Sequence, residues 1–174
     1  YWNIEDSYVD NNAIINCNHV IHVAGFPILN RWSTKNKRLM YDSRVKSTKL
    51  LFEAFKNINA NPNTFICASA IGIYDQTVTE KVCEESPKGR NWLAHLACDW
   101  EAAAEQFKAI GTRVVQMRIS LIFSEKGGFL KYNLLSMKFG ICAIIGKTNR
   151  KVNWMHIYDI CRFIKTCILN EYFQ

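Results

Sequence analysis

The sequence predicts an α/β fold in which parallel strands alternate with helices. Short, continuous apolar runs that end at a glycine, a serine or an arginine are separated by longer amphipathic stretches. Strands that alternate with helices need crossover connections and therefore run parallel. Runs that are apolar throughout indicate that both faces of the sheet are covered. A chain of 174 residues is one domain, or a large piece of one.

The first strand and helix occupy the N-terminal third. Residues 18–23 form an apolar run closed by Ala24-Gly25, which predicts a buried strand and its turn. Ser33 or Thr34 can cap the helix that follows, because a side-chain oxygen there accepts from a free amide of the first turn. Apolar residues at helical spacing carry this helix to about residue 57.

The remaining elements repeat the alternation. In order they are a strand at residues 64–68, a helix at about 92–110, a strand at 112–119, a shorter helix at about 127–139, a short strand near 152–154 and a last helix at about 156–170. Gly111 ends the second helix, since glycine adopts the left-handed conformation of a C-terminal cap at no steric cost.

Composition narrows the class of protein. No window reaches the roughly 18 consecutive apolar residues that span a membrane. The seven cysteines are odd in number and none forms a C-x-x-C pair, which indicates reduced thiols in a cytoplasm-like compartment, an organelle being the alternative. The four histidines do not stand at ligand spacing with cysteines, so we expect no metal site.

The net charge of +7 is concentrated in residues 35–49, which hold six of the 22 basic side chains. One interpretation is a phosphate- or nucleic-acid-binding face. The favoured alternative is the solvated side of an amphipathic helix, because surface helices are polarised in this way.

Three positions fall where strands are predicted to end: Ala24-Gly25, Ser69 and Arg118. The carboxyl ends of parallel strands meet at one edge, where such sheets bind ligands. Ser69 could bind a substrate hydroxyl or carbonyl, or could only satisfy turn groups. Tyr74 could donate to a substrate oxygen, or pack its ring. Arg118 could clamp a phosphate, or form a salt bridge at the rim.

No G-x-G-x-x-G fingerprint and no P-loop occur, so the remaining evidence is the order of weaker motifs. Together they resemble the atypical extended short-chain dehydrogenase/reductases of the nucleoside-diphosphate-sugar epimerase-like family. The matching stretches are Ala24-Gly25-Phe26-Pro27-Ile28, Arg31-Trp32, Ser43-Arg44 with Thr48, Ser69-Ala70-Ile71-Gly72-Ile73-Tyr74, Glu84-Glu85-Ser86-Pro87, Trp100-Glu101-Ala102-Ala103, Arg118, Gly127-Gly128, Ile145-Gly146 and Trp154-Met155-His156-Ile157-Tyr158-Asp159.

The resemblance implies a Rossmann-like, doubly wound parallel sheet that is incomplete, with the first βαβ unit and the C-terminal domain absent. Residues 1–174 would form part of an NAD(P)-binding domain. By this likeness Ala24, Gly25 and Arg118 lie along NADP or NAD, and Ser69 is the counterpart of the class's catalytic serine. Leu93 and Ala97 stand where related epimerases place a tyrosine and a lysine.

Three functions follow as hypotheses. The first is an NAD(P)-dependent oxidoreductase or epimerase-like protein acting on a small hydroxylated or nucleotide-sugar substrate, with Ser69 orienting a substrate oxygen and Tyr74 as a candidate acid. The second is a non-catalytic dinucleotide sensor or interaction protein, and the third and least favoured is a nucleic-acid-binding module. Without the first βαβ unit we expect weak or absent dinucleotide binding, and an exposed sheet edge that favours a homo-oligomer.

Overall fold

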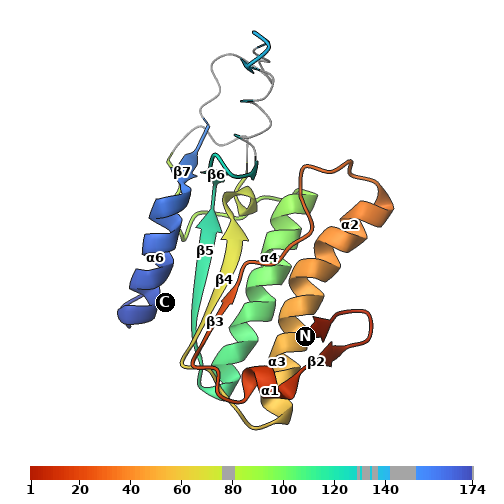
Figure 1. Ribbon diagram of the computed structural model, residues 1–174, viewed down its shortest axis with the longest axis vertical. Coiled ribbons are helices and arrows are strands. Elements are labelled where there is room, and N and C mark those ends of the chain that lie inside the picture. The colour runs from red at the N-terminus through yellow and green to blue at the C-terminus, as the bar shows by residue number, and fades with distance from the viewer. Residues whose placement is uncertain (76–80, 129, 131–133, 135–136, 142–151, 174) are drawn as a thin grey trace. The chain divides into compact units, whose positions relative to one another are not determined.

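The computed structural model describes residues 1–75, 81–128, 130, 134, 137–141 and 152–173 (Figure 1). Two compact units divide the chain. The first holds Tyr1–Arg118 together with Glu171–Gln174, and the second holds Ile119–Asn170.

A three-stranded sheet forms the centre of the first unit. Its strands are β3 (His19–His22), β4 (Thr64–Ala70) and β5 (Arg113–Ile119), in the order β3-β4-β5. The pairing of β3 with β4 is parallel and sets His22 opposite Cys67. The three arrows point the same way in Figure 1. The predicted parallel α/β architecture is therefore confirmed, with one change of boundary: β4 ends at Ala70, two residues beyond the predicted end, and so includes Ser69.

The helix predicted to begin at Ser33 or Thr34 is three consecutive segments. These are α2 (Thr34–Tyr41), the π-helical η1 (Asp42–Lys46) and α3 (Ser47–Asn57). Ser33 is the N-cap, and its side chain accepts from the Asn36 amide at 3.3 Å. A π-helical turn adds a residue to the helical repeat and changes which side chains face the sheet. Periodicity alone does not predict such a turn.

The second long helix is α4 (Trp92–Glu105), which continues as the 3-10 helix η3 (Gln106–Ile110). The Asn91 side chain caps it by accepting from the Ala94 amide at 2.9 Å. Gly111 ends it at φ 80°, as predicted.

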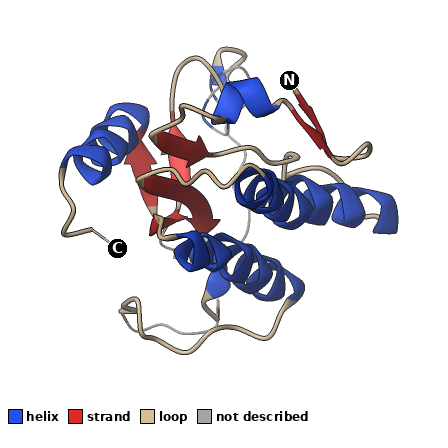
Figure 2. Ribbon diagram, turned by 90° about the horizontal axis from the view of Figure 1, so that it is seen from below, coloured by secondary structure: helices blue, strands red, loops and turns tan. Residues whose placement is uncertain are grey.

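Aromatic side chains join these helices to one face of the sheet. Phe107 stacks on Phe65 of β4 with ring centroids 3.9 Å apart, and meets Phe52 and Phe55 of α3 edge-on at 5.6 and 6.0 Å. On the same face His22 of β3 lies 6.3 Å from the Trp100 ring of α4. The long helices of this unit consequently lie on one side of the strands, as the end-on view shows (Figure 2). This packing fixes how α4 presents its inner side chains to β4 and β5.

Smaller elements complete the first unit. The strands β1 (Trp2–Asn3) and β2 (Tyr8–Val9) form an antiparallel pair ahead of α1 (Asn11–Ile14), and η2 (Ile71–Ile73) follows β4 directly. The N-terminal pair was not predicted, because two strands of two residues leave no periodic signal.

The second unit pairs β6 (Leu121–Phe123) in parallel with β7 (Trp154–His156), and α6 (Ile157–Leu169) follows. The last predicted helix is confirmed within a residue at each end. Six of the thirteen residues of the helix predicted at 127–139, and the whole motif Ile145-Gly146, lie outside the described residues. No described helix has the length and apolar character that crossing a bilayer requires.

Candidate active site

Ser69 points from β4 toward α4 rather than toward solvent. Its hydroxyl donates to Oε1 of Glu101 at 2.7 Å, and only 4% of the residue is exposed. Side chains alternate along a strand, so Ser69 shares the helix-facing side of β4 with Phe65 and Cys67. The hydroxyl that the sequence singled out is therefore satisfied inside the protein.

Glu101 is held on its other side by Arg118 of β5. Nε of Arg118 donates to Oε1 at 2.9 Å and one terminal nitrogen donates to Oε2 at 3.0 Å. The guanidinium and the carboxylate thus form a bidentate ion pair. Lys88 adds a longer ion pair at 3.9 Å. Of the two interpretations of Arg118, the structure shows the salt bridge at the rim.

Glu101 is ionised despite its burial. Burial by itself would raise the pKa of this carboxyl, but hydrogen bonds from Arg118 and Ser69 and the charges of Arg118 and Lys88 together lower the pKa below its ordinary value. Hydrogen bonding to Glu101 in turn raises the pKa of Arg118. The pair is a fixed charge pair, so neither group is suited to exchange protons near neutral pH.

Tyr74 completes the cluster. Its phenol oxygen accepts from the remaining terminal nitrogen of Arg118 at 2.6 Å, and the guanidinium carbon lies 5.3 Å from the ring centroid. The same nitrogen lies 2.6 Å from the Glu84 carbonyl oxygen. The structure thus brings Ser69, Tyr74 and Arg118 together around Glu101, which sequence reasoning had not assigned a role. The sequence signal that could have revealed Glu101 is an acidic residue next to Trp100 on the otherwise apolar face of the predicted helix.

The two positions where related epimerases place a tyrosine and a lysine lie on the first turns of α4. Ala97 is buried against Ile73 and Tyr74, and an added Cβ on Gly72 would stand 3.9 Å from that of Leu93. Neither side chain can transfer a proton.

Ala24 and Gly25 form a separate feature after β3. Both are exposed, and among the described residues no hydrogen bond or ion pair joins them to the Glu101 cluster. A Cβ on Gly25 would stand only 2.7 Å from Cζ of Arg44, so this glycine admits a guanidinium group. The loop is held by the Phe26 amide, which donates to Oγ of Ser43 at 2.8 Å.

The basic stretch at residues 35–49 is mostly used within the protein. Arg38 and Lys46 pair with Asp42 at 3.5 and 2.8 Å. Lys37 lies over two tryptophan rings, and Arg44 faces the loop after β3. Four of its six cations have such contacts, which favours the solvated helix over a nucleic-acid-binding face.

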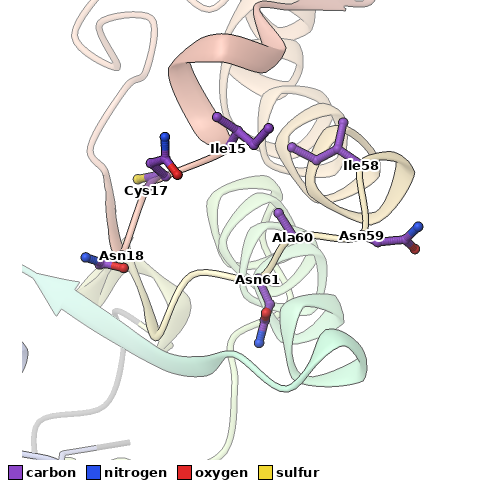
Figure 3. A pocket seen from close by; sticks show the side chains of 8 residues that line it. Ile15, Cys17, Asn18, Ile58, Asn59, Ala60 and Asn61 are labelled. Atoms are coloured by element: carbon purple, nitrogen blue, oxygen red, sulfur yellow. The ribbon is translucent and has the colours of Figure 1, made fainter.

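A cavity of about 500 Å³ lies at the opposite edge of the sheet (Figure 3). The residues that line it come shortly before β3 and β4 in the chain. They are Ile15, Asn16, Cys17, Asn18, Ile58, Asn59, Ala60 and Asn61. It is therefore distinct from the edge that holds Ser69. Within the described part of the chain, no group of three or more histidine, cysteine, aspartate or glutamate side chains could hold a metal ion.

Residues 5–172 match the model of the NAD dependent epimerase/dehydratase family. The chain belongs to this family. The match extends over both compact units and includes every site residue discussed above.

Named relatives agree with the assignment. The chain is 34% identical over 157 residues to the epimerase family protein SA0724 of Staphylococcus aureus, covering 90% of this chain and 52% of that protein. It is 31% identical over 172 residues to the epimerase family protein ML0860 of Mycobacterium leprae, covering 98% and 55%. The chain thus spans about half the length of the curated relatives it matches.

Solved structures confirm the predicted Rossmann-like fold. The human epimerase family protein SDR39U1 with NADPH superposes with a TM-score of 0.81 at 23% identity, over 93% of this chain and 58% of that one. A nucleoside-diphosphate sugar epimerase of Corynebacterium glutamicum gives 0.76 at 26% identity, over 95% and 34%. The UDP-glucuronic acid 4-epimerase of Bacillus cereus in complex with UDP-glucuronic acid and NAD gives 0.78 at 16%, over 96% and 54%.

Proposed function

We propose that this chain belongs to an NAD(P)-dependent oxidoreductase or epimerase that acts on a nucleotide sugar or another small hydroxylated substrate. The observation that carries the proposal is the side-chain cluster of Ser69, Tyr74 and Arg118 at the carboxyl edge of a family-typical parallel sheet. Ligands bind at this edge in open α/β sheets.

The residues after β3 fit a dinucleotide, NADP or NAD. Ala24 and Gly25 are exposed and would hold it through their main chain, with Arg118 behind the nicotinamide side. The space beside the Gly25 Cα is taken by the Arg44 guanidinium, so a ligand here would meet that cation together with the exposed main chain. When bound, the nicotinamide ring would supply the hydride chemistry.

Tyr74 is the proposed proton donor. Its oxygen accepts from Arg118, and its own hydroxyl proton has no acceptor among the described residues. A donor held by a fixed cation is suited to hydrogen-bond or protonate a substrate oxygen. Only 8% of Tyr74 is exposed, so this role requires the hydroxyl to lie within that small accessible part of the residue.

Ser69 was assigned a catalytic role by resemblance, and its hydrogen bond to Glu101 supports a different one. We propose that it is a positioning residue, because its hydroxyl donates to the same Glu101 oxygen that accepts from Arg118 and so helps to hold that ion pair in place. Orienting a substrate oxygen directly would require this hydroxyl to leave a buried carboxylate, which costs about 1–3 kcal/mol if no partner replaces it.

Turnover tests these roles. Epimerisation of UDP-glucose and of UDP-glucuronic acid is followed by proton NMR, and reduced nicotinamide by its absorbance. Tyr74→Phe should lower kcat about 10²- to 10⁴-fold with little change in KM, which is the usual contribution of a general acid. Tyr8→Phe, which removes the hydroxyl of a tyrosine 47% exposed, is the matched control. Full activity of Tyr74→Phe would refute its role.

The second candidate function is dinucleotide binding without catalysis. The apolar Leu93 and Ala97 favour it, since neither can replace a tyrosine and lysine pair. Calorimetry that shows NADP⁺ or NAD⁺ binding, together with no hydride exchange on either sugar nucleotide, would support it over an enzyme that acts on these two substrates.

A further inference from the structure

Arg44 is a partly buried cation that has no counter-ion in the described part of the chain. No carboxylate among the described residues lies within ion-pair distance of it, whereas Arg38, Lys46 and Arg118 all have one. A charge taken from water without a partner destabilises the folded state. Such an arginine needs an explanation from packing or from a ligand.

Packing accounts for only part of the side chain. One terminal nitrogen of Arg44 donates to the carbonyls of Phe26 and Met40 at 3.0 and 3.2 Å, and the guanidinium carbon lies 5.3 Å from the Trp100 ring centroid. A guanidinium carries five N–H donors in a fixed fork. The N–H groups on Nε and on the second terminal nitrogen have no acceptor among the described residues.

The second terminal nitrogen faces Gly25. An added Cβ at Gly25 would stand 2.8 Å from it and 2.7 Å from the guanidinium carbon. The amides of Ala24 and Gly25 make no hydrogen bond within the described residues, and both residues are exposed. Uncommitted donors from a side chain and from the backbone therefore occur together at one exposed turn.

Hydrogen bonds between η1 and the segment after β3 hold Arg44 beside Gly25. The π-helical η1 carries Ser43 and Arg44, and both bind the main chain of Phe26. In the same layer, Nε2 of His22 lies 2.9 Å from Oγ of Ser47. Two segments about 20 residues apart are thus locked together, and π-helical turns recur at functional sites.

We propose that Arg44 and the Ala24-Gly25 backbone bind the oxyanion of a phosphate ester. A tetrahedral oxyanion accepts several donors at once, which matches a guanidinium fork beside free backbone amides. This deepens the proposed function, because the phosphate would belong either to the dinucleotide or to a nucleotide-sugar substrate. It does not depend on hydride chemistry.

Calorimetry with sodium pyrophosphate tests the site on the 174-residue chain, and NADP⁺ and UDP-glucose are titrated to concentrations at which the expected weak binding of a nucleotide is measurable. Arg44→Gln should weaken pyrophosphate binding about 10- to 100-fold, the range expected for hydrogen bonds to a charged group. Arg44→Lys keeps the charge without the fork and should lose less. Arg38→Gln, which removes a neighbouring exposed cation, should stay within about twofold of the unchanged protein, as expected for an exposed pair.

The two nucleotides identify the source of the phosphate. Loss of NADP⁺ affinity alone assigns the site to the cofactor, and loss of UDP-glucose affinity alone assigns it to the substrate. Pyrophosphate that does not bind, or that binds Arg44→Gln as tightly as the unchanged protein, overturns the proposal. A failed turnover assay with intact pyrophosphate binding would instead refute the enzyme and leave this site standing.

Two further measurements test the proposal even if Arg44→Gln fails to fold. Gly25→Ala should displace the guanidinium and weaken pyrophosphate binding, and combining it with Arg44→Gln should cause no further loss, because both changes remove one interaction. In the unchanged protein, pyrophosphate should raise the pKa of His22 in an NMR titration, since Arg44's charge helps to lower it. Additive losses, or a His22 pKa that does not move at saturation, would contradict the proposal.

Discussion

Removing the charge of Glu101 should destabilise the protein more than any other single change to an acidic side chain in the ion pairs described. Glu101→Gln keeps the size of the side chain but leaves Arg118 without its carboxylate and Ser69 with a weaker acceptor. Breaking a buried pair costs about 3–5 kcal/mol. Arg118 keeps 20% of its side-chain surface exposed, so water partly replaces the lost partner, and we expect about 3 kcal/mol.

Urea denaturation at neutral pH measures this loss as a lower midpoint with an unchanged slope. The matched control is Glu53→Gln, because Glu53 pairs with Lys56 at 4.0 Å while 55% and 58% of the two side chains are exposed. That change should stay within about 0.5 kcal/mol. A Glu101→Gln free energy of unfolding equal to that of Glu53→Gln would refute the view that Glu101 organises the site.

Three further predictions concern the titration of His22, the backbone at Gly111 and the hydroxyl of Ser69. Burial, assisted by the charge of Arg44, lowers the pKa of His22 from 6.5 to about 4. The unfolded chain therefore binds a proton at His22 more readily than the folded protein does. The free energy of unfolding should be highest above pH 6.5 and should fall by about 3 kcal/mol as the pH drops to about 4. Urea titrations across this range should show that slope, and His22→Gln should remove it. Gly111→Ala should lower stability by about 1 kcal/mol because φ is 80°, whereas Gly127→Ala, with nothing within 4 Å of the added Cβ, should change little; thermal unfolding compares them. Ser69→Ala should cost about 1 kcal/mol and lower kcat without raising KM for UDP-glucose, and a variant whose kcat is unchanged would remove its positioning role.

Local patterns were sufficient to predict the fold. The apolar runs that became β3, β4 and β5, the cap at Ser33 and the stop at Gly111 each depend on near neighbours in the chain. The order of weak motifs identified the family, which the family model then confirmed. The short β1–β2 pair and the π-helical turn were missed because neither leaves a periodic signal.

The candidate site was predicted only in part. Sequence placed Ser69 and Arg118 at one edge of the sheet, since the ends of parallel strands converge there. It did not show which way Ser69 points, because β4 is buried on both faces and its sequence has no alternation that would distinguish them. The acceptor of its hydroxyl, Glu101, is 32 residues away on α4.

The sequence by itself determined the alternation of the main strands and helices, the family and the edge of the sheet at which to look. Those properties follow from hydrophobic spacing and turn residues, which act over a few positions. Only the tertiary structure decided that Glu101 pairs with Arg118 and that Arg44 has no such partner among the described residues. Ion pairing depends on distances between side chains on different elements, and these are set when the helices pack on the sheet.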